Sequence, residues 1–114
     1  MKIAVAGPYS APTEKERQEN LDCMNRAAAK LMEAGHIPLI GMNAALPVIN
    51  MAALENPYKA TMDISLSVIE HCDAFVLLAE SPGATKERDV ILKKGKPIFK
   101  SAEEAIQHYK TASD

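Results

Sequence analysis

The stretch AESPGATKE, residues 79–87, decides how the rest of the chain is interpreted. An apolar, strand-like run at residues 74–79 leads into it, and a helix-compatible run at residues 84–94 leaves it. Its Pro-Gly pair predicts a tight turn, and Ser81 is suited to cap the helix that follows. We therefore interpret the stretch as a strand–loop–helix junction, the place where parallel α/β sheets carry their functional residues.

Glu87 closes this stretch and is the first candidate for a functional carboxylate. We expect it in the first or second turn of the helix, where free N–H groups and the positive end of the helix dipole keep a carboxylate ionised. The alternative is that Glu87 only complements the dipole of its own helix, since acidic residues are common there. Features elsewhere in the chain have to decide between a functional carboxylate and a residue that only stabilises its helix.

Length and composition predict a single domain covering residues 1–114, which is small for a complete α/β enzyme and makes a site shared with a second subunit plausible. With 47% hydrophobic residues, 25% charged residues and a net charge of -2, the chain gives no electrostatic reason to expect nucleic-acid or membrane binding. Since it shows neither a membrane span nor a signal peptide, we expect it in the cytoplasm.

The sequence contains no recognisable motif for a metal, a cofactor or a serine nucleophile. The two cysteines and three histidines lack the spacing of a zinc site, and we expect Cys23 and Cys72 to be buried free thiols. Motifs of dinucleotide-binding, P-loop, α/β-hydrolase and zinc-protease sites are absent. Ser10 and Ser81 lack a suitably placed histidine, which argues against a serine hydrolase. We predict no metal and no cofactor.

Strand-like runs alternate with helical patterns along the whole chain. The runs are residues 2–6, 36–40, 74–79 and 97–99, and the helical patterns are residues 14–34, 58–72, 84–94 and 101–110. Residues 42–57 are apolar but fit neither pattern, and we expect a lid or a subunit contact there. The alternation predicts a parallel sheet with helices on both faces.

The order of the strands follows from one proline. Pro38 suits the second strand to an edge of the sheet. With right-handed crossovers, this favours a flavodoxin-like, Rossmann-like three-layer sandwich with strand order 2-1-3-4. Ligands bind where the winding reverses, between the first and third strands, and the loops there are residues 7–13 and 81–87. The topology therefore brings Tyr9 toward Glu87.

A second carboxylate would define the chemistry of such a site. Two carboxylates beside a sugar support glycosidic cleavage, because one attacks the anomeric carbon and the other handles the proton of the leaving group. Asp63 supplies the second carboxylate if its helix reaches the same edge of the sheet. The alternative is that Asp63 is a solvated helix residue.

Five segments resemble the nucleoside 2-deoxyribosyltransferase family, and its short members most closely. They are IAVAGPY (3–9), LMEAGHIP (31–38), CDA (72–74), SPGATKE (81–87) and GKPI (95–98). Each segment is weak evidence alone, but their order and spacing across residues 2–99 are specific. The family includes transferases that exchange bases between 2-deoxyribosides and hydrolases that remove the base from deoxynucleoside monophosphates. The resemblance implies a nucleoside or nucleotide as small-molecule partner, and a homo-oligomer in which a neighbouring subunit completes the site.

The resemblance also assigns residues in the two loops. Glu87 matches the family's nucleophilic glutamate, which forms a covalent deoxyribosyl-enzyme intermediate. Tyr9 and Gly7 match residues of the first loop that line the pocket, and we place Tyr9 with the catalytic residues. Ser81 and Gly83 occupy the loop that contacts sugar or phosphate, where a serine resembles the monophosphate hydrolases more than the nucleoside transferases.

Two further assignments lie outside these loops. Asp63 resembles the helix aspartate that helps to protonate the leaving base, although its distance from Asp73 is two residues longer than in the family. Asn43 stands where short relatives often have a Pro-His segment, and it is either a contact to the base or a turn residue. We predict cleavage or transfer of the N-glycosidic bond of a 2'-deoxynucleoside or its 5'-monophosphate; the alternative is a catalytically inactive nucleotide-binding module.

Overall fold

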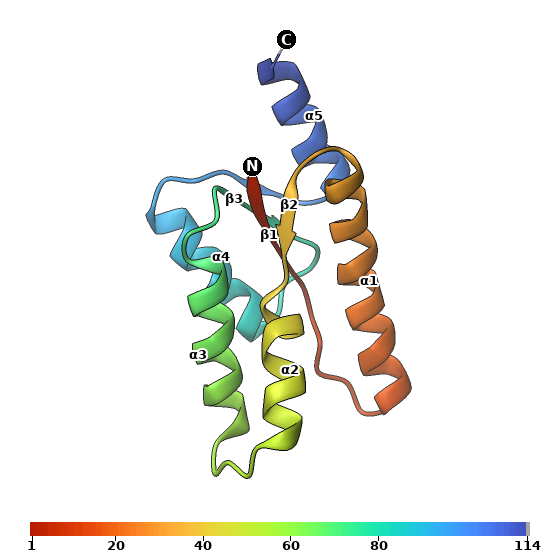
Figure 1. Cartoon of the computed structure of the whole chain (residues 1–114), viewed down its shortest axis with the longest axis vertical. Coiled ribbons are helices and arrows are strands. Elements are labelled where there is room, and N and C mark those ends of the chain that lie inside the picture. The colour runs from red at the N-terminus through yellow and green to blue at the C-terminus, as the bar shows by residue number, and fades with distance from the viewer. Residues whose placement is uncertain (114) are drawn as a thin grey trace.

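The four strands form one parallel sheet whose order confirms the predicted α/β topology (Figure 1). The computed structural model describes residues 1–113, with side chains up to residue 110. The strands are β1 (Lys2–Ala6), β2 (Ile37–Leu39), β3 (Ala74–Leu77) and β4 (Ile98–Phe99), in the order β2-β1-β3-β4 with every pairing parallel. Pro38 pairs with β1 alone, and an edge strand tolerates its missing N–H because one side of the strand has no ladder.

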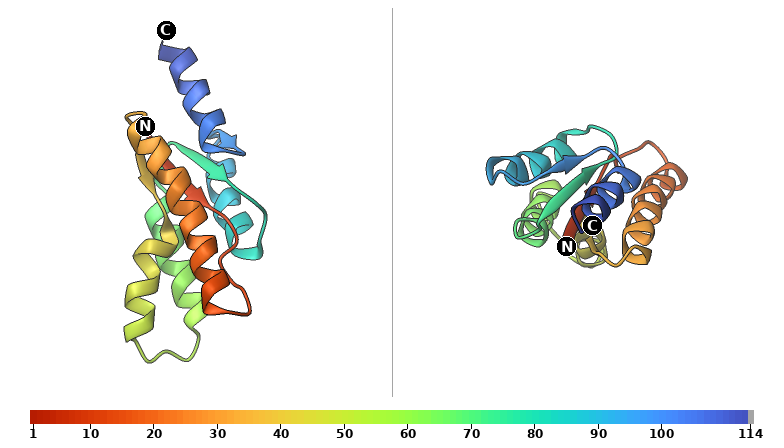
Figure 2. Two further views of the ribbon diagram at one scale, coloured as in Figure 1. Left: turned by 90° about the vertical axis from the view of Figure 1, so that its right-hand side faces the viewer. Right: turned by 90° about the horizontal axis from the view of Figure 1, so that it is seen from above.

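Helices cover both faces of this sheet, as expected for a three-layer sandwich (Figure 2). They are α1 (Glu14–Glu33), α2 (Gly41–Met51), α3 (Pro57–Ile69), α4 (Pro82–Lys93) and α5 (Ala102–Ser113). Because side chains of a strand alternate between faces, Ile3 and Val5 pack into a core with α1 and α5, while Ala4 and Ala6 pack into a core with α3 and α4. Both cores are closed to solvent at the central strands, so the middle of the sheet is a rigid support for the loops above it.

The segment without a predicted structure, residues 42–57, contains most of helix α2. Pro47 lies inside this helix, where it removes one backbone donor, and the helix nevertheless continues to Met51. Helix α2 packs against α3, and together they extend beyond the carboxyl ends of the strands (Figure 1). Whether this segment acts as a lid or a subunit contact stays a prediction.

The Pro-Gly pair of the junction loop also differs from its predicted role. Pro82 and Gly83 do not form a turn before the helix, because they are its first two residues. A proline at the first helical position loses nothing, since its N–H would have no partner inside the helix. The chain bends earlier instead, at Leu78 and Ala79, and Ser81 precedes the helix as its N-cap in an extended conformation.

The cysteine prediction is half wrong. Cys72 is buried, but Cys23 lies on the exposed side of α1, one position before the buried Met24.

Within residues 1–113, no helix has the length and apolar character that crossing a membrane requires. In the same part of the chain, no group of three or more His, Cys, Asp or Glu side chains is arranged to hold a metal ion.

A close backbone approach fixes α2 against α3. A Cβ atom placed on Gly41 would lie 2.6 Å from the Cβ and 2.8 Å from the Cα of Ser65, so any side chain at position 41 forces the helices apart. Gly83, at the start of α4, is different, because its added Cβ would meet only the Sδ of Met62, at 3.3 Å. A methionine side chain can move away, whereas a helix backbone cannot.

We expect Gly41→Ala to lower the free energy of unfolding by about 1–3 kcal/mol, the usual cost of overpacking. Gly83→Ala is the matched control, since it adds the same methyl group in the first turn of a helix, and it should change stability by less than about 0.5 kcal/mol. Urea unfolding of both variants tests this. Equal losses in the two variants would show that the Gly41–Ser65 contact is not rigid.

Candidate active site

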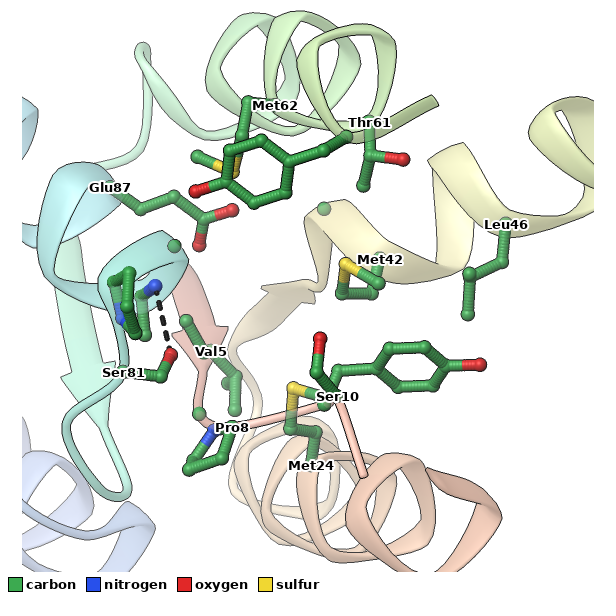
Figure 3. A pocket seen from close by; sticks show the side chains of 18 of the residues that line it. Val5, Pro8, Ser10, Met24, Met42, Leu46, Thr61, Met62, Ser81 and Glu87 are labelled. Atoms are coloured by element: carbon green, nitrogen blue, oxygen red, sulfur yellow. Dashed lines mark hydrogen bonds between the residues drawn. The ribbon is translucent and has the colours of Figure 1, made fainter. Parts of the chain in front are cut away.

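A cavity of about 500 Å³ opens beside the carboxyl end of β1. Its wall is formed by the end of β1 and the loop after it, by α1, α2 and α3, and by the first turns of α4 (Figure 3). The volume lies within the range of small-molecule sites. Tyr9 and Glu87 both line this cavity, as the strand order predicts.

Glu87 is the buried acid of the cavity. Its residue is only 5% exposed, and its carboxyl group points into the cavity among apolar side chains such as Met42 and Met62 (Figure 3). Burial raises the pKa of this carboxyl from its ordinary 4.5 to about 7, and the nearby Ser65 hydroxyl opposes part of the rise. The expectation that the helix start keeps Glu87 ionised is therefore wrong. With Ser81 as N-cap, Glu87 falls in the second turn, where the influence of the dipole has decayed.

Ser81 fixes the helix that carries Glu87. Its Oγ accepts a hydrogen bond from the N–H of Ala84 at 3.2 Å, drawn as a dashed line in Figure 3, and its carbonyl accepts from the N–H of Thr85 at 2.9 Å. Pro82 has no N–H, and the N–H of Ala84 is bonded to Ser81. Among the first three helical residues, this leaves the N–H of Gly83 without a hydrogen bond in the described part of the chain. This helix start therefore offers the cavity a single backbone donor.

The first loop is pinned by side chains of α1. The amide of Asn20 donates to the carbonyl of Tyr9 at 3.0 Å, and the guanidinium of Arg17 donates to the carbonyl of Ala11 at 2.9 Å. Gly7 lies in the same loop, where an added Cβ would touch Leu78 at 3.4 Å, an ordinary contact distance. Gly7 and Tyr9 thus line the cavity on a loop whose backbone is held by hydrogen bonds from α1.

Asp63 and Asn43 lie outside the cavity. Asp63 follows the buried Met62 by one residue, which turns it to the exposed side of α3, where it pairs with Lys59 at 2.8 Å. Asn43 sits in the first turn of α2, not in a turn between elements, and its amide donates to the side chain of Asn25 at 2.8 Å. The structure therefore brings together five of the predicted site residues: Gly7, Tyr9, Ser81, Gly83 and Glu87. Their chemical roles stay predictions.

Sequence reasoning missed Thr61, a polar residue that lines the cavity, and Ser65, which is buried behind the lining residues. Ser65 is fully buried in α3, and among the described residues its hydroxyl makes no hydrogen bond. A signal was present in the spacing, because the resemblance places a helix aspartate two residues nearer to Asp73 than Asp63 is, and that position is Ser65. Tyr58, in the first turn of α3, also lines the cavity.

The cavity is almost free of charge. Among its described lining residues, Glu87 is the only acid, two tyrosines are the only other titratable groups, and no Lys, Arg or His is present. Lys86 lies at its rim, where its Nζ is 5.2 Å from the ring centre of Tyr58. The site therefore suits a ligand that is uncharged over most of its surface.

Comparison with known proteins identifies a family without assigning a reaction. The model of a family described as "Domain of unknown function (DUF4406)" matches residues 1–100. This range contains every strand and all the residues that line the cavity, and it ends before α5. No curated protein matches the chain.

Glu87→Gln should change how stability depends on pH. Between pH 4.5 and about 7 the folded chain holds a proton on Glu87 that the unfolded chain has released, so the wild type loses stability as pH rises through this window. A rise from 4.5 to about 7 corresponds to about 3 kcal/mol. The glutamine variant lacks this loss. We expect it to gain up to about 3 kcal/mol relative to wild type between pH 5 and pH 8 in urea unfolding.

The control is Glu80→Gln, which alters an exposed carboxylate seven residues earlier and should leave the pH dependence of wild type unchanged. Parallel stability curves for wild type and Glu87→Gln would contradict the raised pKa of Glu87.

Proposed function

The chain belongs to the DUF4406 family, and we propose that it cleaves or transfers the N-glycosidic bond of a 2'-deoxynucleoside, with Glu87 as the nucleophile. The observation that carries the proposal is a single buried carboxyl group in the wall of a cavity of about 500 Å³, at the end of the sheet where such folds bind ligands. The resemblance to nucleoside 2-deoxyribosyltransferases supports the same assignment through residues 81–87.

In this mechanism the ionised Glu87 carboxylate attacks the anomeric carbon, and the bond from that carbon to the base nitrogen breaks. The base leaves with the bonding electron pair and takes up a proton. Water or a second base then attacks the same carbon from the face that the first base left, which releases the carboxylate and retains the configuration. A pKa of about 7 leaves Glu87 partly ionised at neutral pH, and few polar groups solvate its charged form.

The proton for the leaving base is the step that the cavity of one chain provides least well. Tyr9 lines the cavity, carries a transferable proton and is our candidate within the chain. Asp63 is given no role, because it faces solvent. We propose a homo-oligomer in which a neighbouring subunit adds a further group from the side of α2, where Val48 and Met51 are exposed.

The charge distribution favours an unphosphorylated nucleoside over its 5'-monophosphate. No cationic side chain is found among the described lining residues, and the start of α4 offers only the N–H of Gly83. The first turn of α1 carries Glu14 and Glu16, so this helix start does not attract a phosphate either. A phosphate in this cavity would therefore lose its hydration without gaining a countercharge.

A nucleotide- or nucleoside-binding module without turnover is the second candidate. It is favoured by one observation, that Glu87 is the only carboxylate among the described lining residues, whereas glycosidic cleavage generally uses two. In this case the N–H groups of a base would satisfy the buried carboxylate, and the complex would be stable.

The first test is incubation of the protein with a panel of deoxynucleosides, with free base measured by chromatography and adducts on the peptide containing Glu87 measured by mass spectrometry. We expect base release, a deoxyribosyl adduct on that peptide, and a kcat/KM that rises with pH about a midpoint near 7. Glu87→Ala should lose about 10³-fold or more in turnover while it keeps ligand binding, and Glu80→Ala should resemble wild type. Ligand bound but unchanged across the panel would establish the binding module instead.

The second test compares each deoxynucleoside with its own 5'-monophosphate. We expect kcat/KM to be at least about tenfold higher for the nucleoside, because a difference of about 1.4 kcal/mol in desolvation is enough for that ratio. The ratio should shrink as salt is added if charge repulsion contributes. Faster cleavage of the monophosphate would refute the preference and leave the N-glycosidic reaction standing.

A further inference from the structure

The hydroxyl groups of α3 behave in two different ways. Thr61 and Ser67 each donate to the carbonyl of the residue four positions earlier, Pro57 and Asp63, and both distances are 2.8 Å. Ser65 lies between them and makes no such bond, although it is 0% exposed. A serine inside a helix normally has this option, and a buried hydroxyl without a partner costs about 1–3 kcal/mol. The Ser65 hydroxyl is therefore directed away from its own helix at a cost in stability.

The packing of α3 against α4 shows which group Ser65 faces. The two helices run side by side in the same direction (Figure 1), and their buried residues are Met62, Ser65 and Ile69 on α3 and Ala84, Glu87 and Ile91 on α4. Both sets have spacings of three and four residues, which place one residue on each successive turn. Met62 meets the start of α4, where its Sδ lies 3.3 Å from the Cβ position of Gly83. One turn further along both helices, Ser65 faces Glu87.

Helix α2 closes the other side of the hydroxyl. The Cβ position of Gly41 lies 2.8 Å from the Oγ of Ser65, and glycine brings no side chain of its own to this contact. Water is excluded from this contact because Ser65 is 0% exposed. The carboxyl group of Glu87 is thus the acceptor that the packing leaves within reach of Ser65.

We propose that Ser65 is a positioning residue, which donates a hydrogen bond from its Oγ to the Glu87 carboxylate when that group ionises and holds it toward the cavity. The Ser65 hydroxyl makes no hydrogen bond in this structure, yet it is near enough to lower the pKa of Glu87. A hydroxyl bonded to a carboxylate forms a short, charge-assisted bond that favours the ionised acid. This direction agrees with the effect of Ser65 on the pKa of Glu87, which it lowers against the larger effect of burial.

Other charges around Glu87 do not replace this contact. The lining residues of β1, α1 and α2 are uncharged, and Tyr9 and Tyr58 are the titratable groups that share the cavity. The charged side chains of α3 and α4 near the site have other partners: Lys59 pairs with Asp63, and Arg88 pairs with Glu80 and Asp89. Lys86 lies at the rim of the cavity against Tyr58. Ser65 is the side chain that lowers the pKa of Glu87 against the effect of burial.

The test measures the pKa of the Glu87 carboxyl by carbon-13 NMR titration of the full chain, in wild type, Ser65→Ala and Ser67→Ala. Loss of the donor in Ser65→Ala should raise this pKa by about 0.5–1 pH unit. Ser67→Ala removes a hydroxyl from the same helix that bonds only its own backbone, and it should leave the pKa unchanged. Ser65→Ala should melt at or above the wild-type temperature, because it removes a hydroxyl without a partner. Ser65→Cys, which keeps a weaker donor, should give an intermediate pKa.

This inference rests on the proposed function only in naming Glu87 a nucleophile. The NMR pKa tests the Ser65–Glu87 contact, and base release tests the reaction. If base release is observed, the pH midpoint of kcat/KM should move upward in Ser65→Ala together with the NMR pKa. A shifted NMR pKa in a chain that never releases base would support the Ser65–Glu87 contact and overturn the reaction. An unchanged Glu87 pKa in both position-65 variants would overturn the positioning role and make Ser65 a packing residue.

Discussion

The Glu87 carboxyl lies in an apolar cavity with no cation against it, and the surrounding helices are arranged in a way that preserves this condition. Helix α4 is anchored by Ser81, so the carboxyl cannot withdraw from the cavity by a shift of its helix start. Helices α2 and α3 shield it from water and supply thioether and aliphatic groups. A buried charge without a partner is costly, and a protein retains it where the stored free energy is used on a ligand.

The sheet could be predicted from the sequence because its determinants are local. Alternating strand and helix patterns define a parallel sheet, and Pro38 decides which strand lies at the edge. Helix α2 could not be predicted in this way, since Pro47 and an uncapped start at Ile40 remove the usual signals of a helix. Its stability comes from packing against α3, which a local pattern does not contain.

The site was predictable to the extent that topology determines it. The loops after β1 and β3 must meet at the switch point, so Tyr9, Ser81 and Glu87 could be placed together in advance. The expected second carboxylate, Asp63, could not be placed correctly in this way. Successive residues of a helix differ by about 100° in direction, so a side chain at position 63 faces solvent and one at position 65 faces the core. Asp63 was chosen because it is an acid, but the buried residue of α3 that packs toward Glu87 is Ser65.

The approach of Gly41 to Ser65 also links two positions that are distant in sequence but share one small volume. With 2.6 Å between the Cβ of Ser65 and the Cβ position of residue 41, a bulkier side chain at either position requires α2 to move outward. Since α2 is also a wall of the cavity, such a movement enlarges the space available to a ligand. The size of the side chains at these two positions therefore limits the width of the cavity, and with it the size of the ligand that the cavity accepts.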